Sequence, residues 1–294
     1  MTEMANSGVA GFKRVARDLI GERGIDLEHG GVDAYEIMAP VIDTDQAMAW
    51  LMNLVKAKGA IMHTDTVCGD LLQQENQLRE RFQADVIVNC TGIAGAEVAA
   101  DGSCYPIRGG LIRVINDGID FPKVDAAMTI SADVSRQNEI VFIVPRNDKI
   151  LLLGGESDIC PECQDIPVLT YRKGFTEPHN WDLDLTLNSP VMQRMKARCE
   201  AFLPALKNAR VDPDYPIAQG LRPFRGTNIR VERELRTFTS GSKPSRIIHS
   251  YGHGGAGWSF SFGCAGNVLG LVKEALLDLA PTGTTSATSA GPEK

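Results

Sequence analysis

The spacing of hydrophobic and polar positions changes in character near Gly109. Before this point, apolar residues recur at helical spacing and predict a helix over Asp45–Ala57. Asp43 or Thr44 is its expected cap, and Gly59 is its expected end. Short apolar runs around this helix predict strands, and one polar stretch predicts a helical or irregular segment. The strands are Tyr35–Pro40, Ala60–Val67 and Asp85–Cys90, and the polar stretch is Leu71–Phe82.

After Gly109 the pattern favours β structure. Short apolar runs between turn residues predict strands, and apolar positions behind Ser189-Pro190 predict a helix within Asp182–Pro204. The apolar face of that helix carries Val191, Met195, Cys199 and Phe202. The expected strands are Gly110–Asn116, Glu139–Val144 and Lys149–Gly154, followed by extended segments at Arg210–Ala218 and Ile229–Arg236 and by a last helix at Asn267–Leu279.

The order of these elements predicts the fold class α/β plus α+β. An α/β domain begins the chain, a β-rich α+β domain is inserted near residue 106, and the chain returns near residue 246. The expected ranges are 32–105 and 246–280 for the first domain and 106–245 for the second. Residues 1–31 and 281–294 are expected to be flexible ends, since the tail is too poor in apolar residues to order itself.

Composition narrows the classes of function. The net charge of −7 argues against non-specific nucleic-acid binding, which depends on Lys and Arg neutralising phosphates. The chain contains no apolar run of the roughly 20 residues that a membrane span needs. Seven cysteines, an odd number in apolar surroundings, suit a reducing compartment. A cytoplasmic location is therefore expected; the chain ends in Glu293-Lys294 and carries no Ser-Lys-Leu peroxisomal signal, although a peroxisomal location stays open.

A glycine-rich loop stands out at the end of the chain, between Ile247 and Trp258. Its spacing Gly252-x-Gly254-x-x-Gly257 satisfies the dinucleotide pattern G-x-G-x-x-G. That pattern belongs at the first turn of a βαβ unit, whereas only one predicted helix follows here. We therefore interpret the loop as backbone pressed against a planar ligand, with a tight turn that binds no ligand as the alternative.

Together with three other stretches, this loop resembles the D-amino-acid oxidase family of flavoproteins. Ala84–Gly92 is similar to the strand and turn that return to the FAD-binding domain, and Tyr105–Gly109 to the crossover into the substrate domain. Gly220–Arg225, with Ile229–Arg233 behind it, is similar to the segment that carries the substrate-binding arginine. The resemblance runs from about Val32 to Leu279 with one interruption, and the four motifs occur in the family's order.

This resemblance implies FAD as the cofactor and a Rossmann-like, N-terminally truncated FAD-binding domain with an inserted β-rich substrate domain. The helix after the glycine loop would start near Ser261 or Gly263, with its dipole directed at the flavin. His253 would pack at the flavin edge, and His63 and His249 are expected to be strand residues with satisfied neighbours. The residues implied to contact FAD are Val67, Thr91, Gly92, Gly254, Gly255, Gly257, Trp258 and Ser259.

The implied reaction is the oxidation of a D-amino acid or a related amine. Arg222 would grip the substrate carboxylate through two parallel hydrogen bonds, and Gly255 would offer backbone to the amine. Hydride transfer from Cα–H to flavin N5 would give an imine, and molecular oxygen would then yield hydrogen peroxide. The alternative for Arg222 is a surface arginine beside a proline, and Arg225 and Arg230 are expected to be structural.

The chain departs from the family pattern in several places. Phe142 and Asn138 stand where the family usually has tyrosines, so amino-acid specificity is altered. No strand, glycine turn and helix for the FAD pyrophosphate precede Val32, so weak FAD affinity is expected for the chain as given. The stretch Ser157–Gly174 is either an extra loop or a retained intron, and its Cys160 and Cys163 form only half of a zinc site, so no metal is expected.

Two other functions stay open beside the D-amino-acid oxidase. The first alternative is a truncated remnant without catalysis. The second is an amine oxidase of a secondary-metabolite pathway with an altered pocket. The expected partners are the small-molecule substrate and oxygen, without nucleic acid or membrane, and a homodimer is left open.

Overall fold

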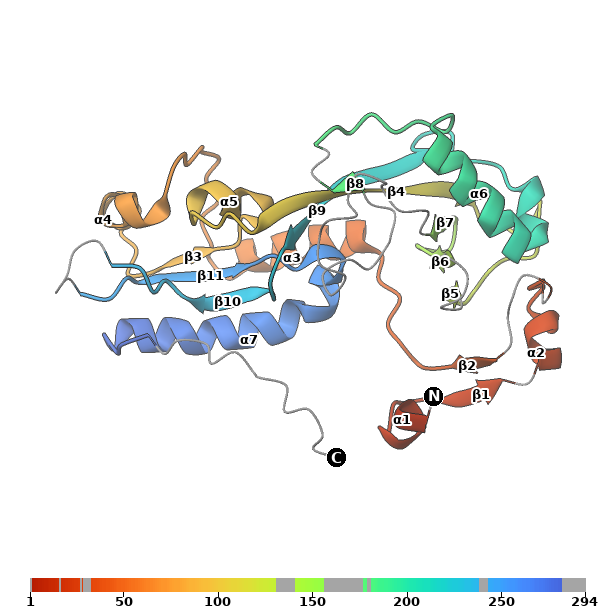
Figure 1. Cartoon of the computed structure of the whole chain (residues 1–294), viewed down its shortest axis with the longest axis horizontal. Helices are drawn as coiled ribbons and strands as arrows, with labels where there is room; N and C mark the ends of the chain where they lie inside the picture. Colours follow the sequence, from red (N-terminus) through yellow and green to blue (C-terminus); the bar gives the residue numbers. More distant parts are fainter. Residues whose placement is uncertain are drawn as a thin grey trace. The chain divides into compact units, whose positions relative to one another are not determined.

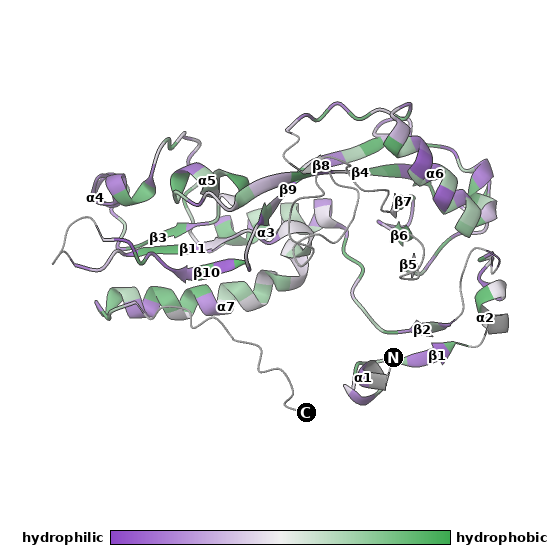
Figure 2. Ribbon diagram, viewed as in Figure 1, coloured by the Kyte–Doolittle hydropathy of each residue, from purple (hydrophilic) through white to green (hydrophobic). Residues whose placement is uncertain are grey.

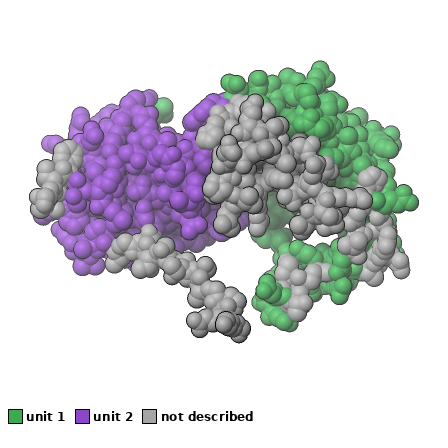
Figure 3. Space-filling model, viewed as in Figure 1, with its two compact units in different colours: residues 1–64, 108–177, 182–220 green, residues 65–107, 178–181, 221–294 purple. Residues whose placement is uncertain are grey.

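A computed structural model describes residues 2–15, 17–26, 28, 33–130, 141–155, 177–178, 181–237 and 243–281. Asn138, the Cys160–Cys163 pair, the stretch 157–174 and the tail from residue 282 lie outside these residues. The chain divides into two compact units (Figure 3). Unit 1 comprises residues 1–64, 108–177 and 182–220, and unit 2 comprises 65–107, 178–181 and 221–294. Residues 32–64 thus fall in unit 1 and 221–245 in unit 2, and the roles assigned to the two domains stay predictions.

The N-terminal part of unit 1 contains short elements. Helices α1 (Thr2–Asn6) and α2 (Arg17–Glu22) accompany strands β1 (Lys13–Val15) and β2 (Ala34–Glu36), which pair antiparallel. Only the first two residues of the predicted strand Tyr35–Pro40 therefore lie in a strand, β2.

Helix α3 (Thr44–Ala57) confirms the prediction made from its spacing and caps. Asp43 Oδ1 accepts hydrogen bonds from the backbone N–H groups of Asp45 and Gln46, at 3.1 and 3.2 Å. Gly59 follows with φ +91°, a left-handed conformation that ends helices and favours glycine.

The predicted strand Ala60–Val67 is wrong. The structure shows no strand there, and Ile61 and Met62 are 81% and 51% exposed. An apolar run forms a strand only where a neighbouring strand satisfies its backbone hydrogen bonds, and the sequence pattern does not report that neighbour.

The largest sheet has the strand order β5-β6-β7-β4-β8, and β9 also pairs with β4. Most of its residues belong to unit 1, whereas the end of β9, Leu221–Arg225, belongs to unit 2. Pairing is antiparallel from β5 to β4, with Ile143 opposite Leu153 and Leu153 opposite Ile112. The bounds are β4 Cys104–Ile115, β5 Met128–Ile130, β6 Val141–Pro145, β7 Ile150–Gly155, β8 Glu177–Pro178 and β9 Ile217–Arg225. Strand β4 begins six residues before the predicted strand at Gly110, so the expected crossover at Tyr105–Gly109 is part of one continuous strand.

Helix α6 (Pro190–Phe202) packs on one face of this sheet and builds the core of unit 1. Its buried residues Met195, Cys199 and Phe202 confirm the predicted face, while Met192 is buried more completely than the predicted Val191. A short 3-10 helix, η4 (Pro204–Asn208), follows.

Unit 2 contains a three-stranded sheet of order β10-β11-β3 (Figure 1). Strand β3 (Ile87–Asn89) runs parallel to β11 (Ile247–Tyr251), and β10 (Arg230–Arg233) runs antiparallel to β11. Charged β10 lies beside the more hydrophobic β11 and β3 (Figure 2). Helices α4 (Leu71–Arg81) and α5 (Gly95–Val98) lie on one side of the sheet and α7 (Gly257–Leu276) on the other, with a small core of Leu71, Val98 and Ile247.

Helix α7 starts at Gly257, not at Ser261 or Gly263 as predicted. A 3-10 turn, η5 (Gly254–Ala256), precedes it. Glycine lowers helix propensity by about 1 kcal/mol relative to alanine, but packing of α7 on β10 and β11 outweighs this local preference. Within the described residues, we find no helix that combines the length and the hydrophobicity needed to traverse a lipid bilayer.

Candidate cofactor and substrate site

Two of the predicted cofactor-binding segments meet at one edge of the unit 2 sheet. Strands β3 and β11 are parallel, with Ile87 opposite Ile247 and Asn89 opposite His249. The Thr91–Gly92 turn follows β3, and the glycine loop follows β11. In open α/β sheets, ligands bind outside the carboxyl ends of parallel strands. This edge is therefore the candidate ligand site of unit 2.

Strand β9 brings Arg222 to the same edge. A Cβ atom placed on Gly255 would lie 3.6 Å from Arg222 Cδ, and one placed on Gly92 would lie 3.5 Å from Pro223 Cβ. Arg222 therefore lies beside the glycine loop, and Pro223 lies beside the turn after β3. Arg222 is half-buried, whereas Gly255 is exposed.

The glycines of the loop serve two different purposes. Gly252 and Gly254 have φ of +80° and +55°, and a Cβ on them would lie 2.6 Å from Arg225 Cγ and 2.8 Å from Phe224 Cζ, respectively. The fold itself therefore requires glycine at these two positions. A Cβ on Gly255 or Gly257 would meet its nearest neighbour at 3.6 or 3.9 Å, which is ordinary contact. Packing against the described residues therefore does not require glycine at these two positions, and their contact with a ligand stays a prediction.

The N-terminus of α7 has no side-chain cap. Its N-cap residue, Ala256, has no side chain that can accept a hydrogen bond, and no side-chain cap is formed. The N-cap side chain therefore supplies no acceptor to the first-turn N–H groups of α7, those of Gly257, Trp258 and Ser259. A helix end of this kind favours an anionic or electron-rich group.

Arg225 and Arg230 have partners within the protein, which supports the structural roles predicted for them. Arg225 Nε donates to Asp101 Oδ2 at 2.8 Å, and Arg230 Nη1 donates to the Tyr251 hydroxyl at 2.7 Å. The Tyr251 hydroxyl in turn donates to Asp101 at 2.8 Å. Burial alone would raise the pKa of Asp101, but hydrogen bonds from Ser103 and Tyr251, together with Arg225, lower it to about 2. Asp101 is therefore ionised at neutral pH.

A buried row of polar side chains crosses the sheet beneath the Thr91 turn. Asn89, His249 and Glu234 come from β3, β11 and the residue after β10, and each is at least 98% buried. Asn89 Nδ2 lies 3.1 Å from His249 Nδ1, and His249 Nε2 lies 3.2 Å from Glu234 Oε2. Satisfied neighbours are expected for His249 from the sequence, but the row itself is not. Its main signal in the sequence is an asparagine and a histidine within two mostly apolar strands.

The remaining predicted residues differ in their surroundings. Val67 belongs to the irregular segment before α4 and is 37% exposed, whereas Trp258 is half-buried and Ser259 exposed. His253 Nε2 lies 3.4 Å from Cys264 Sγ on α7, and burial lowers the pKa of His253. His63 is exposed and outside any strand, so its predicted place in a strand is wrong.

Phe142 belongs to unit 1, on β6. Its neighbours Val141 and Ile143 face the α6-packed core, so Phe142 faces the opposite side of the sheet, where it is half-buried. The Phe142 ring packs on Gly154 of β7. A Cβ atom placed on Gly154 would lie only 2.7 Å from Phe142 Cδ2. A role of Phe142 toward the substrate stays a prediction.

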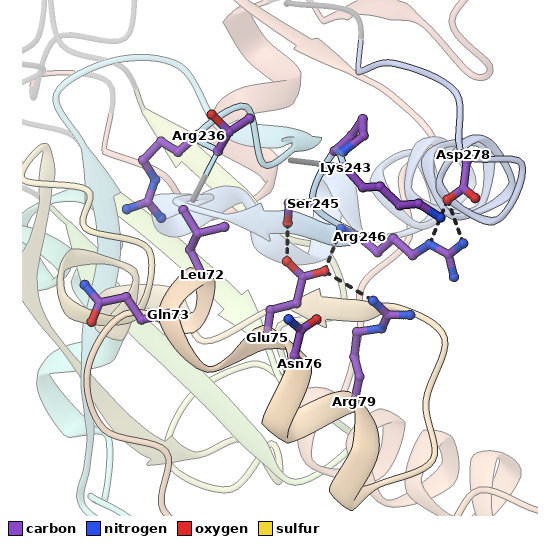
Figure 4. Close-up of a pocket in the computed structure, with 12 residues that line it drawn as sticks. Leu72, Gln73, Glu75, Asn76, Arg79, Arg236, Lys243, Ser245, Arg246 and Asp278 are labelled. Atoms are coloured by element: carbon purple, nitrogen blue, oxygen red, sulfur yellow. Dashed lines mark hydrogen bonds and ion pairs between the residues drawn. The ribbon is translucent and has the colours of Figure 1, made fainter. Parts of the chain in front are cut away.

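A separate cavity of about 470 Å³ lies at the amino end of β11, the opposite end from the glycine loop (Figure 4). Glu75 accepts hydrogen bonds from Ser245 Oγ and the Arg246 backbone N–H, both at 2.8 Å, and Arg246 pairs with Asp278. None of the predicted site residues lines it. The lining residues are Leu72, Gln73, Glu75, Asn76, Arg79, Arg236, Thr237, Lys243, Pro244, Ser245, Arg246 and Asp278.

Comparison with known proteins supports the family resemblance. The sequence model of the family described as FAD dependent oxidoreductase matches residues 15–269. The chain is 28% identical over 269 residues to a D-amino-acid oxidase of Rubrobacter xylanophilus, covering 91% of this chain and 66% of that protein. It is 31% identical over 272 residues to a D-amino-acid oxidase of Streptomyces coelicolor, covering 86% and 69%.

The relatives are longer than this chain. A D-amino-acid oxidase of Dictyostelium discoideum is 28% identical over 270 residues, which are 91% of this chain but 62% of that protein. Among solved structures, an L-proline dehydrogenase from P. horikoshii matches with a TM-score of 0.61 at 14% identity, covering 93% of this chain and 66% of that one. This match confirms the mixed α/β, Rossmann-like fold class.

Proposed function

The chain belongs to the D-amino-acid oxidase family of FAD dependent oxidoreductases, and we propose that it takes part in the FAD-dependent oxidation of D-amino acids or related amines. One observation carries the proposal. The Thr91–Gly92 turn, the glycine loop and Arg222 come from three distant stretches and converge at one carboxyl edge of a parallel strand pair. That edge combines an open helix N-terminus with a guanidinium group, as a flavin and a carboxylate substrate require.

The residues present fit FAD, and each has a distinct part. The N–H groups of Gly257, Trp258 and Ser259 would hold the electron-rich edge of the flavin, while Thr91, Gly92 and Gly254 would shape the surface beside it. FAD, when bound, supplies the two-electron oxidation of the substrate and passes the electrons to molecular oxygen.

Arg222 and Gly255 would orient the substrate. The planar guanidinium of Arg222 would bind a carboxylate through two parallel N–H donors, and the backbone of Gly255 would accept from the amine. A Cβ built on Gly255 would lie 3.8 Å from Arg222 Nε, so the two groups are close enough to hold one small molecule. When the carboxylate and the amine of a substrate are both held in place, the direction of its Cα–H bond is fixed. The chain therefore contributes positioning, and the proposal needs no side chain that acts as a general base.

Arg222→Lys tests the proposal. It keeps the positive charge and loses the fork, so kcat/KM for a neutral D-amino acid should fall about 10- to 150-fold, as expected for the loss of one charge-assisted hydrogen bond of about 1.5–3 kcal/mol. Arg194→Lys, an exposed position on α6, is the matched control and should change nothing. Hydrogen peroxide release by the FAD-supplemented chain is the measurement.

The substrate panel separates the alternatives. An amine oxidase that does not use a carboxylate would turn over amines without one and would be insensitive to Arg222→Lys. A chain that binds no FAD in a fluorescence titration, and releases no peroxide from any donor, would be the non-catalytic remnant, and the proposal would fail.

A further inference from the structure

The hydrogen bonds around Asn89 fix the direction of the buried polar row. Thr91 donates to Asn89 Oδ1 twice, from its backbone N–H at 3.1 Å and from its hydroxyl at 2.8 Å. Both donors face the same oxygen, so the Asn89 amide must turn its NH₂ group to the other side. That side is His249 Nδ1.

The orientation of Asn89 then determines the tautomer of His249. Because Nδ1 accepts from the Asn89 NH₂, the ring proton sits on Nε2, which donates to Glu234 Oε2. In the opposite tautomer, the Nδ1–H group of His249 would face the NH₂ group of Asn89, so two donors would meet. The lone pair on Nε2 would then face the Glu234 carboxylate. Only the neutral Nε2–H form satisfies all three side chains.

Glu234 anchors the far end of the row. Arg236 donates to Glu234 from its backbone N–H at 2.9 Å and from Nη2 at 2.6 Å, and it also pairs with Asp70. Burial alone would raise the pKa of Glu234, but the hydrogen bonds from His249 and Arg236 lower it. Glu234 is thus a fixed acceptor for the His249 ring.

We propose that Asn89, His249 and Glu234 are positioning residues that hold the Thr91–Gly92 turn in the orientation that contacts the flavin. Through Asn89, the row directs both the N–H and the hydroxyl hydrogen of Thr91 inward. The Thr91 side chain is exposed, so its hydroxyl oxygen can still accept a hydrogen bond from a ligand. Gly92, with φ +62°, follows at once, so a rotation of the Asn89 amide would move the turn itself. This inference rests on the proposed function.

Substitutions at His249 separate positioning from simple core stability. His249→Leu removes both the acceptor for Asn89 and the donor to Glu234, which releases the Asn89 amide. His249→Gln can restore one acceptor and one donor, so it should rescue. Tyr251→Phe is the matched control on β11, since it loses hydrogen bonds to Asp101 and Arg230 and keeps the ring that packs on His249.

Amide hydrogen exchange at Thr91, measured without FAD, reads the turn directly. We expect exchange about tenfold faster in His249→Leu, the effect of roughly one lost hydrogen bond, with near wild-type exchange in His249→Gln and Tyr251→Phe. Nitrogen-15 NMR of the ring should show the proton on Nε2 alone. If His249→Leu does not fold, Thr91→Val, which removes only the hydroxyl, should still weaken FAD binding.

FAD titration of the same variants completes the test, with the dissociation constant rising in the order of the exchange rates. Unchanged Thr91 exchange in His249→Leu, or a proton on Nδ1, overturns the proposal. Faster exchange with unchanged FAD affinity also overturns it, because the orientation of the turn then does not affect FAD binding. A wild-type chain that binds no FAD refutes the proposed function instead, and exchange and NMR then decide the polar row independently.

Discussion

Alanine at Gly252 and at Gly255 should damage the protein in opposite ways, although the two positions lie three residues apart. At Gly252 the backbone has φ +80°, and a new Cβ would lie 2.6 Å from Arg225 Cγ. At Gly255 the backbone is not left-handed, and the new Cβ would lie 3.6 Å from Arg222 Cδ. The first change therefore strains the fold, whereas the second places a methyl group at the predicted ligand surface.

The magnitudes follow from these contacts. A non-glycine residue in the left-handed region costs about 1–2 kcal/mol, and overpacking adds about 1–3 kcal/mol. Arg225 cannot move away freely, because Asp101 holds its Nε at 2.8 Å. Gly252→Ala should thus lower the free energy of unfolding by about 2–5 kcal/mol. Gly255→Ala should leave it unchanged or raise it by about 0.4–1 kcal/mol, because alanine restricts the unfolded chain.

Urea unfolding and FAD titration on the same two variants provide the assay. Gly252→Ala should unfold at a clearly lower urea concentration. Gly255→Ala should unfold like the wild type yet bind FAD or the substrate at least about tenfold more weakly, a loss of about 1.4 kcal/mol. If Gly255→Ala loses as much stability as Gly252→Ala, protein packing explains both glycines. If it loses neither stability nor binding, the loop does not contact a ligand.

Two further predictions concern Phe142 and Asp101. Phe142→Tyr should keep the thermal midpoint, since the ring lies outside the α6-packed core, and should strengthen binding of neutral D-amino acids by at most ~1.5–3 kcal/mol; unchanged KM values would remove Phe142 from the pocket. Asp101, with its pKa lowered from 3.8 to about 2, should contribute about 2 kcal/mol of stability above pH 4 that is lost as the pH falls toward 2. Acid unfolding of Asp101→Asn should lack this component, and identical acid profiles would contradict the assignment.

Elements with strong local signals could be predicted from the sequence. Helix α3 follows from its spacing, the Asp43 side chain and Gly59, all of which lie within or next to the helix. Helix α6 follows in the same way from Pro190 and a buried face. These signals act over a few residues, so no distant partner needs to be known.

Elements that depend on distant partners could not be predicted. The run Ala60–Val67 looks like a strand but finds no neighbour, and α7 begins four to six residues earlier than its composition suggests. The family motifs located the segments of the site, yet they could not tell which glycines the fold itself requires. That distinction needs the positions of Phe224 and Arg225 relative to the loop.

The register between β3 and β11 couples the fold to the candidate site. Asn89 and His249 are 160 residues apart in sequence and meet only because they are opposite each other in this parallel pair. A slip of one residue would turn every side chain of β11 to the other face of the sheet, so His249 would leave Asn89 and Ile247 would leave the core with Leu71 and Val98. The same pairing that buries Ile247 therefore orients Asn89, and through it Thr91. Hydrophobic burial selects the register, and the register in turn sets the polar contacts at the candidate site.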